Sequence, residues 1–230
     1  MVEKSIMLLF YGDGFVKLEP VVEFRGMTPE RRQKLLDVLS RRQAGLAVVM
    51  ENVQDPHNIS AVMRTCDAVG IQDIYILNTK IPRHKKFGPR SSSSAAKWLS
   101  VHHFDNATAC FEALREAGFE RILTTHLGAD SVNVHDIDFT GSAALVFGNE
   151  QEGVSEEIRQ LSDGNFLIPQ MGIIQSLNIS VACAVTIYEA LRQRNAAGKY
   201  KTASLPAERR DALLQEWGFI GEEIKTDTAL

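Results

Sequence analysis

Short apolar runs alternate with amphipathic stretches along most of the chain. The runs that predict buried strands lie at 46–50, 73–77, 101–104, 121–125, 143–147 and 166–168. Apolar residues at helical spacing predict helices between and after them, at 58–70, 106–117, 155–161 and 179–191. Strands that alternate with helices are typical of a parallel sheet covered on both faces. We therefore expect an α/β fold with a mostly parallel sheet and helices on both of its faces.

Capping residues mark the ends of several predicted helices. Thr28 stands before Pro29 and is expected to cap an N-terminal helix. Asn58 is expected to cap the next helix, and Gly70 to close it. The helix at 179–191 is apolar on nearly every side. We therefore expect it to be buried all round, by the core on one side and by a partner on the other.

Composition indicates an ordinary globular protein. The chain has 230 residues, of which 44% are hydrophobic and 23% charged, so it can bury a large core without disulfides or a structural metal. Disulfide-stapled miniproteins, collagens and disordered chains are excluded. We interpret the three cysteines, Cys66, Cys110 and Cys183, as reduced and buried. The histidines lack metal-ligand spacing, so no metal site is expected.

No long apolar segment or repeat divides the chain. The apolar run at 6–11 is too short for an export signal or a membrane span, so we expect a cytoplasmic protein. We divide the sequence into residues 1–26 as an N-terminal extension, 27–45 as an N-terminal helix, 46–195 as one α/β domain, and 196–230 as a C-terminal extension with a helix near 206–217.

The charges are separated along the chain. There are 25 Lys and Arg residues against 29 Asp and Glu, a net charge of −4. Residues 74–104 nevertheless contain six basic and no acidic residues, and residues 190–207 contain four and none. An acidic body with basic segments is an arrangement that a polyanion-binding protein can use. Solvated surface faces give the same pattern, so charge alone leaves both interpretations open.

Three polar loops follow predicted strands, where ligands of parallel α/β sheets collect. They are NVQDPHNISAVMR at 52–64, FGNEQEGVS at 147–155 and IPQMGIIQSLN at 168–178. None is a P-loop or a GxGxxG turn, which makes a nucleotide triphosphatase or an ordinary dinucleotide fold a poor match. The second loop is acidic, so it disfavours phosphate and suits a sulfonium compound or a ribose. A structural glycine turn is the alternative interpretation of that loop.

These loops overlap three segments that resemble the three motifs of the SPOUT superfamily of RNA methyltransferases: DPHNISAVMRTCDAVG, LVFGNEQEGVSEE and IPQMGIIQSLNISVACAVTIYEALRQR. RRQ at 41–43 and THL at 125–127 are similar to the SpoU/TrmH type, which methylates the ribose 2′-hydroxyl of the D-loop guanosine, guanosine-18, in tRNA. The resemblance covers about residues 27–217. It implies a C-terminal deep trefoil knot in a SPOUT methyltransferase domain, S-adenosyl-L-methionine as cofactor, and a homodimer.

The resemblance also implies which residues form the site. The catalytic positions are Arg64, Asn58, Glu150, Ser176 and Asn178. The cofactor-binding positions are Thr125, Leu127, Gly148, Ile168, Ser176 and Leu177. A guanidinium group has a pKa of about 12 or more, so we interpret Arg64 as a clamp on a phosphate and the reacting hydroxyl, and leave the proton acceptor open.

The expected partner is tRNA, with no DNA and no membrane. By resemblance, Arg31, Arg42, Arg192 and Arg194 contact the RNA. From the acid-free window we add Lys80, Arg83, Lys85, Lys86 and Arg90.

Two alternative functions remain at this stage. Ribosomal RNA ribose methyltransferases commonly carry a separate N-terminal RNA-binding domain, for which residues 1–45 are too short. A catalytically silent RNA-binding dimer would not need the side chains at the implied catalytic positions, which are intact in this sequence.

Overall fold

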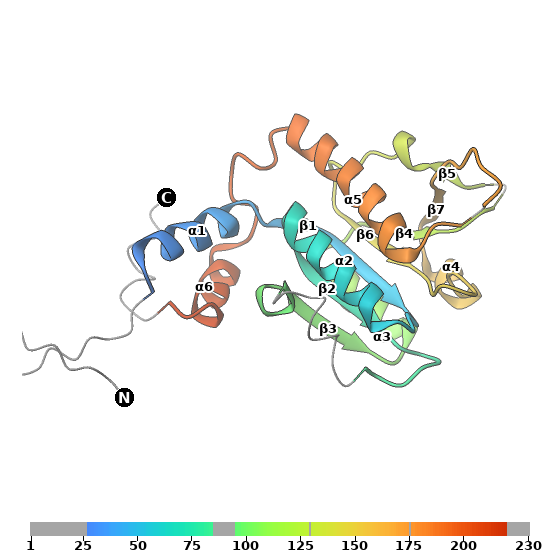
Figure 1. The fold of residues 1–230 in the computed structure, drawn as a ribbon, viewed down its shortest axis with the longest axis horizontal. Coiled ribbons are helices and arrows are strands. Elements are labelled where there is room, and N and C mark those ends of the chain that lie inside the picture. The colour runs from blue at the N-terminus through green and yellow to red at the C-terminus, as the bar shows by residue number, and fades with distance from the viewer. Residues whose placement is uncertain (1–26, 85–94, 129, 175, 220–230) are drawn as a thin grey trace, which may run out of the picture.

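A parallel sheet forms the centre of the computed structural model, which describes residues 27–84, 95–128, 130–174 and 176–219 (Figure 1). Its seven strands have the order β3-β2-β1-β6-β4-β7-β5, and each neighbouring pair is parallel. The strands are β1 (Gln43–Glu51), β2 (Ile71–Leu77), β3 (Ser100–Phe104), β4 (Arg121–Thr125), β5 (Val132–Asn133), β6 (Ala143–Phe147) and β7 (Gly164–Leu167). The predicted α/β class with a parallel sheet is confirmed.

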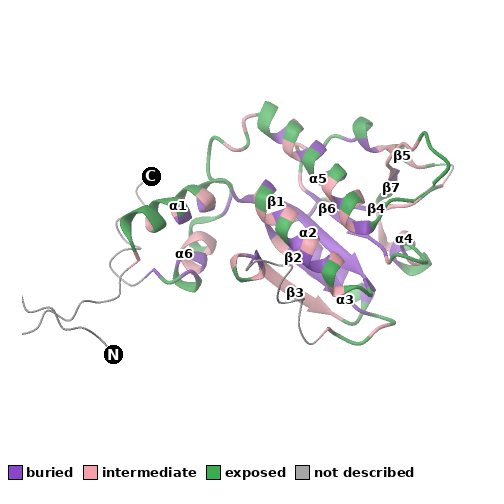
Figure 2. Ribbon diagram, viewed as in Figure 1, coloured by how far each residue is buried: buried purple, intermediate pink, exposed green. Residues whose placement is uncertain are grey.

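Helices cover both faces of the sheet. They are α1 (Pro29–Ser40), α2 (Pro56–Val69), α3 (Ala107–Glu116), α4 (Glu156–Leu161), α5 (Ile179–Ala196) and α6 (Ala207–Glu216), with short 3₁₀ turns η1 (Ala95–Trp98) and η2 (Val134–Asp136). Successive residues of β1 point to opposite faces. Val48 and Met50 pack with α2 and α5, whereas Ala47 and Val49 pack with α3 and α4. Figure 2 shows the resulting burial of the central strands.

The start of α2 differs from the prediction. Asp55 is the N-cap, and its Oδ1 accepts a hydrogen bond from His57 N at 2.8 Å. Pro56 opens the helix, because its fixed φ suits a first turn and its missing N–H needs no partner there. The prediction that Asn58 caps α2 is therefore wrong. Asn58 lies inside the first turn, which leaves its side-chain amide for other contacts.

The terminal helices share a small third core at one end of the sheet (Figure 1). Leu35 and Leu39 of α1 pack with Leu213 of α6, and Trp217 and Trp98 contact each other edge to face at 5.7 Å. This core is separate from the two that flank the sheet. The terminal helices are thereby held against the α/β domain by side-chain packing.

Helix α5 is buried on its core side only. Cys183 and Ile187 are fully buried there, against α2 and the sheet. Val181, Val185 and Tyr188 are 47%, 37% and 50% exposed, so burial of the other side by a partner stays a prediction. The three cysteines are reduced and buried, as predicted. Among the described residues, no helix has the length and apolarity needed to span a membrane.

Candidate active site

The three polar loops meet at one edge of the sheet. Strands β1 and β6 are parallel neighbours, so the loops that follow them leave from the same edge. Asn58 Nδ2 donates to Glu150 Oε1 at 2.7 Å, which joins the first loop region to the second. Asn178 Nδ2 donates to Asn58 Oδ1 at 3.2 Å, which joins the third to the first. The structure thus brings three of the predicted catalytic side chains into one hydrogen-bonded chain.

Local contacts fix which group donates and which accepts in the hydrogen bonds among Glu150, Asn58 and Asn178. Asn178 is the N-cap of α5, and its Oδ1 accepts from Ser180 N at 2.8 Å and from Ser180 Oγ at 2.6 Å. Its amide nitrogen is therefore the group that faces Asn58. Asn58 uses both ends of its amide, and the backbone N–H of Gln54 adds a bond to Glu150 Oε2 at 3.4 Å. The Glu150 carboxylate is held on both of its oxygens.

The second loop owes its shape to its glycines. Asn149 and Gly153 exchange two backbone hydrogen bonds, of 3.1 and 3.2 Å. Gly153 has a φ of +69°, and a Cβ on Gly148 would lie 2.0 Å from backbone atoms of Gly153. Asn149 Oδ1 closes the turn by accepting from the backbone N–H groups of Gln151 and Glu152. The structural glycine turn is real, and it is also what presents Glu150 to Asn58.

Arg64 lies on the exposed surface of α2, six residues beyond Asn58 and about 9 Å further along the helix axis. Ser176 is exposed in the loop that leads into α5. These two predicted catalytic residues therefore belong to the elements that carry Asn58 and Asn178.

The predicted cofactor residues lie at the ends of adjacent strands. Thr125 ends β4, Gly148 follows β6, and Ile168 follows β7. The Thr125 hydroxyl donates to Val146 O at 3.4 Å, so it is already engaged within the sheet. Leu127 and Leu177 are exposed at 59% and 38%, which leaves apolar surface beside these strand ends. Within the described ranges, no cluster of His, Cys, Asp and Glu side chains is arranged to hold a metal ion.

Two supporting contacts were missed by the sequence reasoning. Glu51 is buried at the end of β1, and its Oε2 accepts from Ser155 N at 2.9 Å, which anchors the end of the second loop. His126 Nε2 accepts a hydrogen bond from Arg159 Nη1 at 2.7 Å, which joins the THL segment to α4. A carboxylate directly after an apolar run was a visible signal for Glu51. The His126 contact had none, because Arg159 comes from a distant helix.

Two of the predicted RNA contacts are wrong. The Arg42 guanidinium has no exposed surface, and Arg194 is 3% exposed. Arg194 donates to four acceptors at 2.5 to 3.2 Å: Phe139 O, Gln43 Oε1, Gly45 O and Gly141 O. Its burial lowers the pKa of the guanidinium group. Arg194 therefore joins α5 to β1, and a phosphate has no access to either arginine.

The other predicted RNA contacts within the described ranges are accessible. Arg31 and Arg83 are exposed, whereas Lys80 pairs with Glu152 at 2.7 Å and Arg192 with Glu189 at 2.7 Å. The hydrogen bond from Arg192 lowers the pKa of Glu189 to about 2. The other predicted RNA contacts, Lys85, Lys86 and Arg90, lie outside the described residues.

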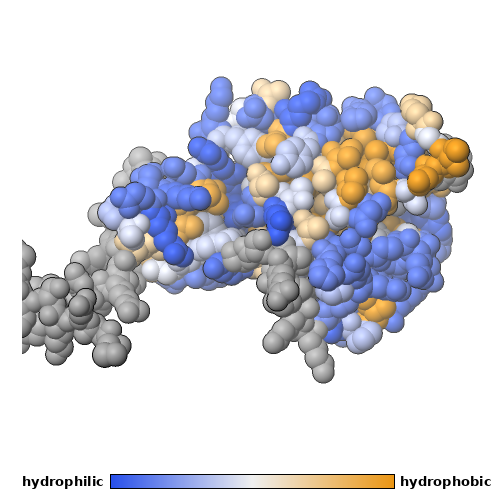
Figure 3. Space-filling view, in the orientation of Figure 1, coloured by the Kyte–Doolittle hydropathy of each residue, from blue (hydrophilic) through white to orange (hydrophobic). Residues whose placement is uncertain are grey.

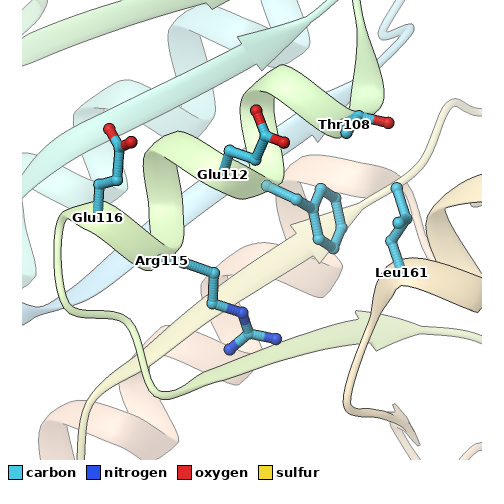
Figure 4. Close-up of a pocket in the computed structure, with 6 residues that line it drawn as sticks. Thr108, Glu112, Arg115, Glu116 and Leu161 are labelled. Carbon is cyan, nitrogen blue, oxygen red and sulfur yellow. The ribbon is translucent and has the colours of Figure 1, made fainter.

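A pocket of about 380 Å³ lies away from this site, between α3 and the end of α4 (Figure 4). Thr108, Phe111 and Leu161 contribute to its lining, and Arg115 at its edge pairs with Asp163 at 2.7 Å. Helices α3 and α4 cover the face of the sheet opposite α2 and α5. The pocket therefore has no contact with the hydrogen-bonded chain, and we assign it no part in the chemistry.

Comparison with known proteins places this site in context. Residues 45–188 match the SpoU rRNA Methylase family. The tRNA (guanosine(18)-2′-O)-methyltransferase of Thermus thermophilus is 40% identical over 195 residues, which cover 84% of this chain and 98% of that protein. The crystal structure of the Aquifex aeolicus TrmH/SpoU tRNA modifying enzyme has a TM-score of 0.76 at 38% identity, covering 82% of this chain and 94% of that one.

A second similar structure holds a ligand. It is the SpoU methyltransferase AviRb from Streptomyces viridochromogenes in complex with the cofactor AdoMet. Its TM-score is 0.60 at 30% identity, and the match covers 70% of this chain and 62% of that chain.

Proposed function

Because the chain belongs to the SpoU rRNA Methylase family, we propose that it transfers the methyl group of S-adenosyl-L-methionine to the ribose 2′-hydroxyl of guanosine-18 in the D loop of tRNA. The observation that carries the proposal is the set of hydrogen bonds among Glu150, Asn58 and Asn178, which joins the three loops. Arg64 lies on α2, the helix that also carries Asn58. The match to the T. thermophilus enzyme leaves almost none of that protein uncovered, which favours tRNA over ribosomal RNA as substrate.

The roles of the side chains follow from the reaction. A ribose hydroxyl is a poor nucleophile at neutral pH, and methyl transfer from a sulfonium is an in-line displacement, so alignment supplies most of the catalysis. Asn58 and Asn178 hold each other and Glu150 in a fixed geometry beside the substrate. Arg64 is exposed on α2 and clamps a phosphate together with the hydroxyl.

The strand ends fit an adenosine-bearing cofactor. Gly148 is buried, and a Cβ there would meet the backbone of Gly153 and Val154, so glycine at this position lets the second loop close tightly at the end of β6. Leu127 and Leu177 offer apolar surface, and small-molecule sites are mostly apolar. Because the Thr125 hydroxyl is engaged, the polar contacts of Thr125 and Ile168 come from their backbone groups. When bound, S-adenosyl-L-methionine supplies the electrophilic methyl group.

The proposal includes a homodimer. The exposed face of α5, with Val181, Val185 and Tyr188, is continuous with Ile173 and Ile174 in the loop before it. Figure 3 shows apolar side chains gathered over this region. Apolar patches of this kind mark protein interfaces, and a second copy of the chain would cover it.

We also propose the C-terminal trefoil knot. Strand β7 pairs with β4 on the side away from β6, yet α5 packs against α2, which lies against β2 on the far side of β1. The segment after β7 therefore crosses back over β4 and β6, which is compatible with a threaded chain.

With tRNA as the substrate, we propose that the protein acts in the cytoplasm.

The proposed reaction is tested by incubating the protein with radiolabelled S-adenosyl-L-methionine and separate pools of unmodified tRNA and ribosomal RNA. We expect label in tRNA alone, released on nuclease digestion as 2′-O-methylguanosine. Label in ribosomal RNA alone would establish the ribosomal alternative. Label in neither pool, with a folded protein that binds RNA, would establish the silent binder.

A further inference from the structure

Arg42 forms the junction between the terminal helices and the α/β domain. Its Nη2 donates to Asp67 Oδ1 at 2.7 Å and to Trp98 O at 3.2 Å, and its Nη1 donates to Ile71 O at 3.2 Å. The ring of Trp217, at the end of α6, lies 5.6 Å from the guanidinium carbon. One fully buried cation thus contacts η1, α6 and both sides of the turn between α2 and β2.

Other contacts hold the same end of α2. Tyr200, in the segment after α5, donates its hydroxyl to Val69 O at 2.8 Å. Gly70 ends the helix with a φ of +84°, and a Cβ there would lie 2.7 Å from Arg41 O. The carboxyl end of α2 is therefore packed against the chain that links α1 to β1, with no free space at the turn.

The helix that ends at this junction also carries the reactive residues. Asn58 lies in the first turn of α2, and Arg64 lies one turn before Asp67. Both residues belong to one hydrogen-bonded helix, so a shift of the Asp67 backbone moves the Arg64 backbone with it. The bond between Arg42 and Asp67 is thus one turn of helix away from the residue assigned to the substrate.

The chemistry of the junction requires arginine. The planar fork of a guanidinium reaches one carboxylate and several carbonyl oxygens at once, which a lysine ammonium cannot do from the same position. The Arg42 side chain has no exposed surface, whereas the Asp67 side chain is 35% exposed. Burial of a charge beside an opposite charge adds little net stability, because desolvation offsets the attraction between the two. A buried charge at this place is therefore better explained by the geometry that it imposes than by stability.

We propose that Arg42 is a positioning residue for methyl transfer. It fixes the carboxyl end of α2 against the terminal helices, and through α2 it fixes the placement of Arg64. The inference rests on the proposed function for the reaction, but the junction itself is visible in the contacts of Arg42 alone.

The test compares Arg42→Lys with Arg41→Lys, the same charge-conserving change at the exposed neighbouring arginine. The rate of a single turnover is measured at saturating tRNA and cofactor, and the affinity for each is measured separately. For Arg42→Lys we expect a rate at least about tenfold lower, with both affinities within about twofold of wild type. Arg41→Lys should match wild type in all three quantities.

Two results with folded Arg42→Lys would overturn the inference. An unchanged single-turnover rate would reduce Arg42 to a stabilising residue. A weaker tRNA affinity with a shallower salt dependence would make it a phosphate contact after all. If Arg42→Lys does not fold, Asp67→Ala replaces it, because this change removes the carboxylate on α2 that accepts from Arg42 Nη2. A wild-type rate in Asp67→Ala would then reject the inference.

Hydrogen exchange gives a readout that does not depend on activity. In Arg42→Lys, the backbone amides of residues 64–69 should exchange at least about tenfold faster than in Arg41→Lys, because their end of α2 is released. Unchanged exchange would reject the junction. If the wild-type protein methylates no RNA, the proposed reaction fails while this measurement still decides the role of Arg42.

Discussion

Replacing Gly148 by alanine places a methyl group against the backbone of the second loop. The added Cβ would lie 2.0 Å from both the carbonyl carbon and the oxygen of Gly153, and 2.2 Å from Val154 N. No side-chain rotation can relieve such a clash, so the loop must open. Opening breaks the two backbone hydrogen bonds between Asn149 and Gly153. At about 1 kcal/mol each, their loss lowers the free energy of unfolding by about 2 kcal/mol.

Thermal unfolding measures this cost. A loss of about 2 kcal/mol corresponds to a Tm about 4 to 8 °C lower for a protein of this size. Cofactor affinity, measured by calorimetry, should fall at least about tenfold, because the loop no longer holds its shape at the strand end. Gly141→Ala is the control, since its Cβ would meet only Arg121 Nη2, at 3.8 Å. If Gly148→Ala matched this control in Tm and in cofactor affinity, the close packing of the loop would have no role.

Three further predictions concern the substrate, the RNA surface and pH. Arg64→Ala should lower the transfer rate by at least about 100-fold and leave cofactor affinity nearly unchanged in calorimetry; lost cofactor binding in a folded variant would contradict its assignment to the substrate. Arg83→Ala should reduce the slope of log tRNA affinity against log salt by about one, and an unchanged slope would remove Arg83 from the interface. Glu189 has a pKa lowered to about 2, chiefly by the hydrogen bond from Arg192, so its stabilising effect is present above the ordinary pKa of 4.5 and is lost as the pH falls towards 2. Lowering the pH from 4.5 towards 2 should therefore reduce the free energy of unfolding of wild type more than that of Glu189→Gln. Parallel curves of this free energy against pH would contradict the strength of the contact.

Much of the fold follows from the sequence because its strands are short apolar runs. The runs at 121–125 and 143–147 are strands over the same residues in the structure, and the helix expected at 155–161 forms with Ser155 as its cap. Strand β5 has two residues, too few to give a period, and no pattern predicted it. The start of α2 was misplaced because Asp55 and Asn58 are both good caps, and only Pro56 at the first helical position decides between them.

The site was predicted less evenly. The motifs named Asn58, Glu150 and Asn178, but only the fold shows that their side chains bond one another. Arg41 and Arg42 are adjacent and chemically identical, yet one is exposed and the other fully buried. What separates them is a carboxylate on α2 and an indole ring on α6. Arg42 and Arg194 were assigned to the RNA by resemblance, and a motif does not show contacts of this range, so it could not reveal that both side chains are buried.

The identity of the methyl acceptor is the central claim, and one substrate tests it most directly. Two synthetic tRNAs are compared, which are identical except that one carries 2′-deoxyguanosine at position 18 and therefore lacks the proposed acceptor oxygen. With labelled S-adenosyl-L-methionine, we expect the unmodified tRNA to take up one methyl group per molecule and the deoxy substrate to take up none, although both bind. Equal labelling of the two tRNAs would show that the methyl group goes elsewhere, and would contradict the account.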